Sequence, residues 1–304
     1  MENSYREYLS LETGEKISLF MSTLSSTNRT PEYYVNWNKA VNNTREYELE
    51  LNTLNFLIGK ENIKELAEGL FSDQPNLIRA IPSLIACRDK KFDVLELDEN
   101  VKFYNLDFKN VDITKINEYI KFCEDSGLFN FLKNDANRSL VDYVYGVEVG
   151  LDSNGRKNRS GTTMEMIVEK YVKKTCEEIG FKYMTQASHI QIKSHWDIDV
   201  PVDKSSRRFD VAVFDPYRRK LFLIETNYYG GGGSKLKSVS GEFVTLHQFL
   251  TSNSEDITFI WITDGQGWKT AHIPLSEAFY KIDNIFNIDM LSQNYLKYAL
   301  TDGE

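Results

Sequence analysis

Cysteine is scarce in this sequence of 304 residues: Cys87, Cys123 and Cys176 are odd in number and far apart. Without Cys-x-x-Cys spacing they predict no disulfide framework or metal knuckle, so we expect free, buried thiols in a reducing compartment. The four histidines are scattered and form no His-Glu-x-x-His pattern, which argues against a zinc enzyme. The spacing of a nucleotide P-loop and the Gly-x-Ser-x-Gly elbow are absent too.

Long apolar runs are also missing, and no stretch is apolar enough to predict a membrane span. The polar, acidic N-terminus lacks the basic start and continuous apolar stretch of a secretory signal. We therefore expect a cytoplasmic protein that does not associate with a membrane. With 41% hydrophobic residues, the chain can still bury a core large enough for one large domain or two.

The charge balance is acidic overall but uneven along the chain. The net charge of −9 argues at first against a polyanionic partner. Residues 154–240, however, hold 16 lysine and arginine residues against 10 acidic ones, while the rest of the chain holds 20 against 35. The basic stretch is therefore the place to look for a phosphate-binding site.

The pattern predicts an α/β protein with two parts. Residues 1–140 are expected to be mostly helical, with apolar residues at helical spacing and a further helix from about Ile113 to Cys123. The polar stretch 152–161 is predicted to be a loop between the parts, followed by a long helix that Ser160 or Thr162 caps and Gly180 ends. Residues 141–304 form the second part.

This second part is predicted to contain a mixed sheet flanked by helices. Arg208–Phe214 and Leu221–Asn227 are rich in β-forming residues and are joined by a short turn, which indicates a hairpin. A helical segment around 243–250 and a third strand, Ile257–Thr263, follow. The order helix, strand, strand, helix, strand is typical of a mixed α/β unit.

Two acidic residues interrupt the apolar hairpin strands, Asp210 and Glu225. Burying an ionised carboxylate costs several kcal/mol unless a cation or hydrogen bonds compensate. If the hairpin sets the two side by side, their oxygens can hold Mg²⁺, which needs only one or two carboxylates and keeps several waters. Asn227 lies on the same face as Glu225 by strand alternation, and Glu165 from the preceding helix is a third acidic group.

Each of these residues also has a purely structural interpretation. Asp210 can pair with Arg207 or Arg208 at a strand edge, and Glu225 can be solvated at a strand end. Glu165 in a first helical turn is stabilised by the helix dipole without any function. A carboxylate pair also fits glycosidase chemistry, although the basic neighbours suit a polyanion better than a sugar.

The glycine-rich stretch Tyr228–Leu236 follows the second strand and contains Lys235. Such a loop allows backbone N–H groups to approach a phosphate, and a DNA backbone phosphate is the simplest ligand; a flexible turn is the alternative. Gln266, between Gly265 and Gly267, can contact adenine in a major groove, or the turn simply positions Trp268 for packing.

The spacing from Asp210 to Glu225-Thr-Asn227, preceded by the helix with Glu165, resembles the PD-(D/E)xK nuclease core. Longer stretches look like the DpnII/MboI family of type II restriction endonucleases. They are Asp142–Gly161, Tyr228–Leu236 and Trp261–Trp268, with Asn55–Gly59 and Ile81–Arg88 in the helical half. The similarity therefore covers most of the chain.

This resemblance implies a homodimer that cuts unmethylated GATC in double-stranded DNA before the G, leaving a four-base 5′ overhang. A cognate adenine methyltransferase would act on the same site without needing to bind the protein. Asp210 and Glu225 would hold Mg²⁺, with Asn227 and Glu165 supporting the water. Arg156, Lys157, Arg159 and Lys235 would contact phosphates, and the helical half would support the nuclease, contact DNA or dimerise.

Two other hypotheses stay open, and one departure from the nuclease pattern motivates the second of them. Asn227 stands where the superfamily usually has lysine, so Lys235 or the substrate itself must compensate. A repair or structure-specific nuclease would show the same core but cut without sequence preference. A DNA-binding protein with a decayed active site would bind in Mg²⁺ without cutting.

Overall fold

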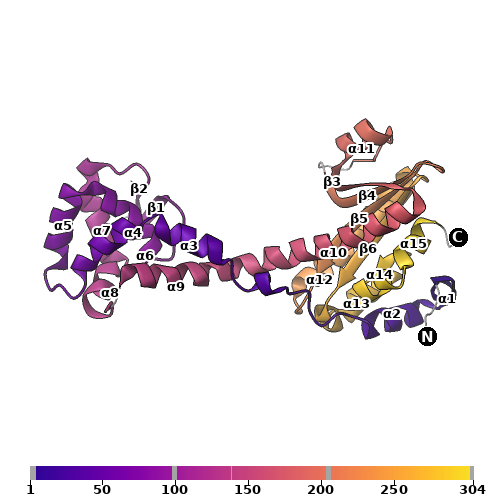
Figure 1. Cartoon of the computed structure of the whole chain (residues 1–304), viewed down its shortest axis with the longest axis horizontal. Coiled ribbons are helices and arrows are strands. Elements are labelled where there is room, and N and C mark those ends of the chain that lie inside the picture. Colours follow the sequence, from indigo (N-terminus) through magenta and orange to yellow (C-terminus); the bar gives the residue numbers. More distant parts are fainter. Residues whose placement is uncertain (1–4, 98–100, 138, 203–206, 302–304) are drawn as a thin grey trace. The chain divides into compact units, whose positions relative to one another are not determined.

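The computed structural model describes residues 5–97, 101–137, 139–202 and 207–301. The chain divides into two compact units, which Figure 1 draws. Unit 1 combines Met1–Pro31 with Lys157–Glu304, and unit 2 is Glu32–Arg156. Within the described ranges, no helix is both long and apolar enough to cross a membrane.

These boundaries differ from the division expected at residue 140. Helix α2 (Thr13–Ser22) packs against α13 (His272–Phe279), with the rings of Phe20 and Phe279 5.4 Å apart, so the N-terminal segment belongs to unit 1. Helix α9 (Leu140–Asp152) packs on α3 and α4 within unit 2. Contacts between segments far apart in sequence decide both boundaries, and sequence periodicity does not report such contacts.

Unit 2 is mainly helical, as predicted, and also contains a two-stranded antiparallel sheet that the sequence analysis missed. The exposed face of this hairpin also carries apolar residues, such as Leu97 and Phe103, so the alternation of its strands is weak. Unit 2 comprises α3 (Trp37–Arg45), α4 (Glu48–Leu54), η2 (Asn55–Leu57), α5 (Ile63–Asp73), η3 (Pro75–Ala80), α6 (Ile81–Leu84), β1 (Lys91–Leu97), β2 (Val101–Asp107), η4 (Ile113–Lys115), α7 (Ile116–Asp125), α8 (Leu128–Asn134), α9 and η5 (Ser153–Gly155), with η1 (Pro31–Tyr33) at its start.

Unit 1 holds a five-stranded mixed sheet with helices on both faces (Figure 1). The strand order is β3-β4-β5-β6-β7, antiparallel from β3 to β5 and parallel from β5 to β7. The elements are α1 (Tyr5–Ser10), α2, α10 (Arg156–Ile179), β3 (Lys182–Ser188), α11 (His189–Trp196), β4 (Arg208–Asp215), β5 (Lys220–Tyr228), α12 (Ser234–Asn253), β6 (Ile257–Asp264), η6 (Gln266–Thr270), α13, β7 (Ile285–Phe286), α14 (Ile288–Ser292) and α15 (Tyr295–Leu300).

The hairpin and the third strand predicted from the sequence are confirmed as β4, β5 and β6. The predicted loop at 152–161 is wrong, because α10 begins at Arg156. The Ser160 hydroxyl, expected to cap a later helix start, instead donates to the Asn28 side chain at 3.0 Å. Asn28 returns a 2.8 Å bond to the Ser160 carbonyl, so a tertiary contact replaces the local cap. The predicted stop is confirmed, since Gly180 follows α10 with φ +75°.

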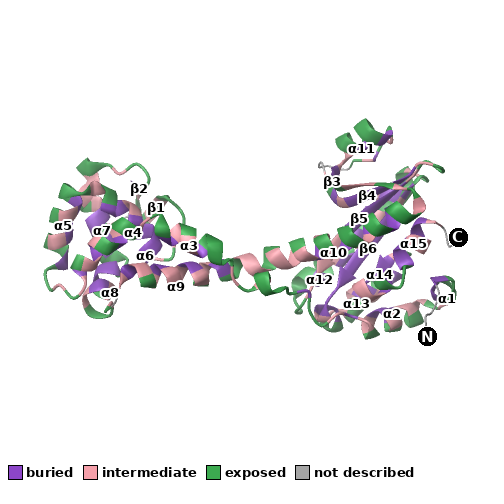
Figure 2. Ribbon diagram, in the orientation of Figure 1, coloured by how far each residue is buried: buried purple, intermediate pink, exposed green. Residues whose placement is uncertain are grey.

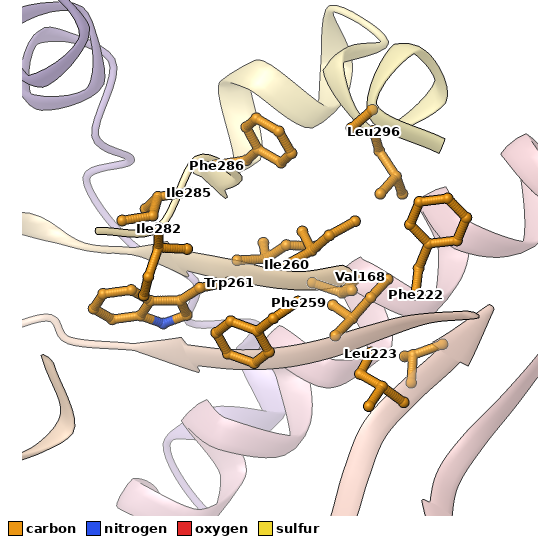
Figure 3. Close-up of a cluster of buried hydrophobic side chains, with 14 of the residues drawn as sticks. Val168, Phe222, Leu223, Phe259, Ile260, Trp261, Ile282, Ile285, Phe286 and Leu296 are labelled. Carbon is orange, nitrogen blue, oxygen red and sulfur yellow. The ribbon is translucent and has the colours of Figure 1, made fainter. Parts of the chain in front are cut away.

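Both faces of the central strands are buried in unit 1 (Figure 2). Phe259 and Trp261 contact Phe243 of α12 on one face. The other face carries side chains such as Ile260, beside Phe286 (Figure 3). Strands covered on both sides read as continuous apolar runs, which is why β4 to β6 were recognisable from sequence. Any acidic residue within them needs a specific compensation.

Cys123 and Cys176 are free and buried as expected, whereas Cys87 is only half-buried. Burial raises the pKa of the Cys123 and Cys176 thiols to about 12, so neither is a reactive thiolate at neutral pH.

Candidate active site

The two acidic residues of the hairpin are cross-strand neighbours. The β4–β5 ladder ends at the pair Val211 and Ile224, which makes Asp210 and Glu225 the next residues on the two strands. Directly opposed residues of an antiparallel pair point to the same face of the sheet. Beyond the last pair, the backbone N–H of Thr226 donates to the Asp210 carboxylate at 2.8 Å, which fixes that carboxylate at the open end of the hairpin.

The carboxyl pair is electrostatically strained. Burial, and secondly the negative charge of Asp210, raise the pKa of Glu225 to about 8, although the Arg207 guanidinium acts in the opposite direction. Burial also raises the pKa of Asp210, against hydrogen bonds from Thr226 and other neighbours that lower it. The ionisation of each carboxyl group thus depends on the other. A proton or a cation bound between the two carboxyl groups would therefore relieve their repulsion.

Gln186 on β3 joins this site, and the sequence analysis missed it. The β3–β4 register places Gln186 beside Asp210, where its backbone adopts φ +50°, an uncommon conformation for a residue other than glycine. Its Nε2 lies 3.2 Å from Glu165 Oε2 and 3.5 Å from Asp210 Oδ1. The only sequence signal was a polar residue inside a short, weakly apolar strand.

Glu165 on α10 is linked to the site through the amide of Gln186. Burial first, and the charge of Asp210 second, raise the pKa of the Glu165 carboxyl. The negative charge of Asp210 therefore acts on Glu165 as it acts on Glu225.

Asn227 follows on the same face of β5. The register pairs it with Thr263 of β6, whose hydroxyl donates to Asn227 Oδ1. That hydroxyl in turn accepts a 2.8 Å bond from Trp268 Nε1. Among the residues the structure describes, the amide N–H groups of Asn227 have no partner, so Asn227 offers donors to a ligand.

The glycine-rich loop and the turn after β6 are packed tightly together. Gly267 N–H donates to the Tyr229 carbonyl at 2.8 Å, and a Cβ on Gly267 would lie 2.4 Å from the Gly231 carbonyl oxygen. A Cβ on Gly265 would lie 2.3 Å from the Tyr229 oxygen. Close backbone approach therefore explains two of these glycines, whatever ligand the loop binds.

Gln266 in this turn is used structurally. Its Nε2 donates to the carbonyls of Leu24 and Ser25, at 2.8 and 3.1 Å, and so holds the N-terminal segment against the rest of unit 1. The adenine contact predicted for Gln266 stays a prediction, and the fold engages its amide donors elsewhere.

The basic residues expected to contact phosphates lie on α10 and α12. Lys157 and Lys235 are exposed, and Lys235 is the second residue of α12. Arg156 is half-buried and donates through Nε to the Tyr34 carbonyl at 3.2 Å, and Arg159 is half-buried as well. Within the described residues, Lys235 makes no ion pair with Asp210 or Glu225.

The arrangement fits a divalent cation that prefers oxygen ligands. Two desolvated, mutually repelling carboxyl groups at a strand end are the donors that Mg²⁺ takes together with several waters. The described residues contain no group of three His, Cys, Asp or Glu side chains able to hold a metal on their own. Such a site would be completed by water and by a bound ligand.

Comparison with known proteins gives matches along nearly the whole chain. Residues 16–298 match the family described as "DpnII restriction endonuclease". The type II restriction enzyme LlaDCHI of Lactococcus lactis subsp. cremoris is 56% identical over 294 residues, which are 96% of this chain and 97% of that protein. The type II restriction enzyme MjaIII of Methanocaldococcus jannaschii is 44% identical, over 92% of this chain and 98% of its own. The type II restriction enzyme DpnII of Streptococcus pneumoniae is 34% identical, over 91% of this chain and 96% of that protein.

Proposed function

Because this chain belongs to the DpnII restriction endonuclease family and is thereby a type II restriction enzyme, we propose that it cuts unmethylated double-stranded DNA at GATC. Cleavage falls before the G on both strands and requires Mg²⁺. The juxtaposition of Asp210 and Glu225 at the open end of the hairpin supports the Mg²⁺-dependent cleavage most directly. Because such an enzyme acts on DNA that enters the cell, it would work in the cytoplasm.

The proposed catalytic residues have separate tasks. Asp210 and Glu225 would hold Mg²⁺, which supplies positive charge to the phosphate and to the departing 3′ oxygen and favours ionisation of water. Gln186 keeps the Glu165 carboxylate near Asp210, where Glu165 can orient the attacking water. Asn227 donates its amide hydrogens to a phosphate oxygen, because its own oxygen already accepts from Thr263.

DNA contacts are assigned to the basic residues of the two helices. Arg156, Lys157, Arg159 and Lys235 would neutralise backbone phosphates, which position DNA without reading its sequence. The base contact proposed for Gln266 would have to use its amide oxygen, because its nitrogen serves Leu24 and Ser25. Unit 2 would add support, DNA contacts or the dimer interface.

The symmetry of the proposed target suits a homodimer. A palindromic site presents the same phosphate geometry twice, so a two-fold dimer places one active site on each strand. Methylation of adenine at N6 removes one donor hydrogen and adds bulk in the major groove. A buried partner left unpaired costs roughly 1 to 3 kcal/mol before any clash is counted. A cognate adenine methyltransferase can therefore protect host DNA without binding this enzyme.

A plasmid digest tests the proposal. The protein is incubated with Mg²⁺ and with one plasmid in adenine-methylated and unmethylated forms, with EDTA controls, and the fragment ends are sequenced. We expect cuts before GATC in unmethylated DNA only. Asp210→Asn should abolish cleavage, while Asp199→Asn, which removes an exposed carboxylate of the same unit, should not.

The outcomes separate the competing functions. Metal-dependent cuts without regard to GATC would retain the nuclease and discard the specificity. Binding of DNA without any cutting in Mg²⁺ would favour a protein with a decayed site. Full cleavage by Asp210→Asn would remove the catalytic assignment.

A further inference from the structure

The proposed site lacks the lysine that usually supplies a positive charge beside the carboxylates. Asn227 is neutral, and its side-chain oxygen is held by Thr263. Lys235, the substitute that the sequence suggested, is exposed and has no ion pair with the carboxyl pair in the described part of the chain. A positive charge that touches the reacting phosphate must come from another residue or be unnecessary.

Arg207 is the basic residue closest to fulfilling this task. It immediately precedes β4, and its Nη1 lies 3.5 Å from Glu225 Oε1. Its Nη2 lies 2.7 Å from Glu242 Oε1 on α12. Across the described residues, no other lysine or arginine forms an ion pair with Asp210 or Glu225. The guanidinium is therefore already held at the mouth of the carboxyl pair.

The contacts of Arg207 leave it able to take a further anion. A guanidinium has five N–H donors in a planar fork that matches two phosphate oxygens. The contact with Glu225 is long, and that with Glu242 involves a carboxylate that is 53% exposed. A cation bound between Asp210 and Glu225 would also weaken the hold of Glu225 on Arg207, since it competes for the same oxygens.

We propose that Arg207 is the catalytic cation of this enzyme, and this inference rests on the proposed nuclease function. Its guanidinium binds a non-bridging oxygen of the scissile phosphate. It offsets the negative charge that builds up there as a water oxygen bonds to phosphorus and the bond to the 3′ oxygen breaks. The attacking water releases a proton to solvent, and the departing 3′ oxygen takes one up. Glu242 is a positioning residue that keeps the guanidinium directed toward the phosphate.

A structural alternative makes a different prediction. If Arg207 only neutralises the buried Glu225, saturating Mg²⁺ would replace it, and its removal would matter little under those conditions. If Arg207 acts on the phosphate, Mg²⁺ cannot replace it. The rate of the cleavage step at saturating Mg²⁺ therefore distinguishes the two roles.

The test compares Arg207→Gln, Arg207→Lys and wild type on a short GATC duplex. Glutamine keeps a donor for Glu242 but removes the charge, and lysine restores the charge without the fork. Lys182→Ala is the control, because it removes one exposed positive charge at the start of β3, whereas Arg207 lies next to Arg208, which pairs with Ser188 at the end of that strand. Single-turnover cleavage is measured at saturating Mg²⁺, duplex affinity in Ca²⁺ by fluorescence anisotropy, and Mg²⁺-dependent thermal stabilisation without DNA.

We expect Arg207→Gln to cleave roughly 100-fold more slowly or worse, as for loss of one transition-state donor. Arg207→Lys should recover about 10-fold of this loss. The stabilisation by Mg²⁺ should persist in both variants, and Lys182→Ala should cleave like wild type.

The proposal is overturned if Arg207→Gln cleaves at nearly the wild-type rate, or if extra Mg²⁺ alone restores it. It is also overturned if the slow variant no longer shows stabilisation by Mg²⁺, because Arg207 would then act through the metal ligands. Failure of wild type to cut, or cutting by Asp210→Asn, would count against the proposed function instead. The two failures are thus distinguishable.

Discussion

Replacing Glu225 by glutamine should stabilise unit 1 above neutral pH, although it removes a proposed metal ligand. In the folded protein the pKa of Glu225 is raised from 4.5 to about 8, mainly by burial. Between about pH 4.5 and pH 8, the folded state therefore keeps a proton on Glu225 that the unfolded chain releases. Stability associated with this group is complete below about pH 4.5 and is lost as the pH rises toward 8.

The magnitude follows from that pKa change. At 1.36 kcal/mol per unit, a rise from 4.5 to about 8 has a ceiling of roughly 5 kcal/mol. Water at the open end of the hairpin reduces this, so we expect Glu225→Gln to be more stable than wild type by about 2 kcal/mol or more near pH 9. Near pH 5 the difference should vanish, because protonated glutamate resembles glutamine.

Urea unfolding in EDTA, followed by tryptophan fluorescence, measures this effect in the relevant unit. Trp196, Trp261 and Trp268 are buried in unit 1, whereas Trp37 of unit 2 is 64% exposed. Adding Mg²⁺ should stabilise wild type and leave Glu225→Gln nearly unchanged. A stability difference that stays constant from about pH 5 to pH 9 would refute the raised pKa, and equal stabilisation by Mg²⁺ would refute the ligand role.

Three further perturbations test other parts of the structure. Gly267→Ala should destabilise unit 1 by about 2 kcal/mol or more, because its Cβ would lie 2.4 Å from a backbone oxygen. Gly161→Ala, which has open space around it, should not destabilise the unit, and urea unfolding measures both variants. Glu148→Ala should destabilise unit 2 by about 3 kcal/mol, because it leaves the Arg88 guanidinium unpaired. Glu124→Ala, which removes an exposed ion pair, should change the stability little, and hydrogen exchange of unit 2 amides measures the difference. Gln186→Ala should slow single-turnover cleavage about 10-fold without weakening duplex affinity in Ca²⁺, and an unchanged rate would remove its positioning role.

Much of unit 1 could be predicted because its signals are local. The strands β4, β5 and β6 are continuous apolar runs bounded by turns, and the length of the runs identifies buried strands. Acidic residues inside such runs are conspicuous, which is how Asp210 and Glu225 were selected. The end of α10 was equally readable, since Gly180 adopts a positive φ that favours glycine.

The weaker elements were not readable for the same reason. The β1–β2 hairpin of unit 2 covers its core with only part of one face, so its alternation is diluted by exposed residues. Strand β3 is also half-exposed at the sheet edge, and with it Gln186 was overlooked. A short edge strand is specified largely by its neighbour and only weakly by its own composition.

The sequence by itself determined the family, the apolar strands of the sheet and the two carboxylates, because each depends on residue types at fixed spacings. Only the tertiary structure decided which distant segments complete the site. It brings Gln186 and Arg207 to the carboxyl pair, attaches residues 5–31 to unit 1, and turns an expected loop into the start of α10. These features rest on contacts between residues far apart in the chain, whose energies no local pattern encodes.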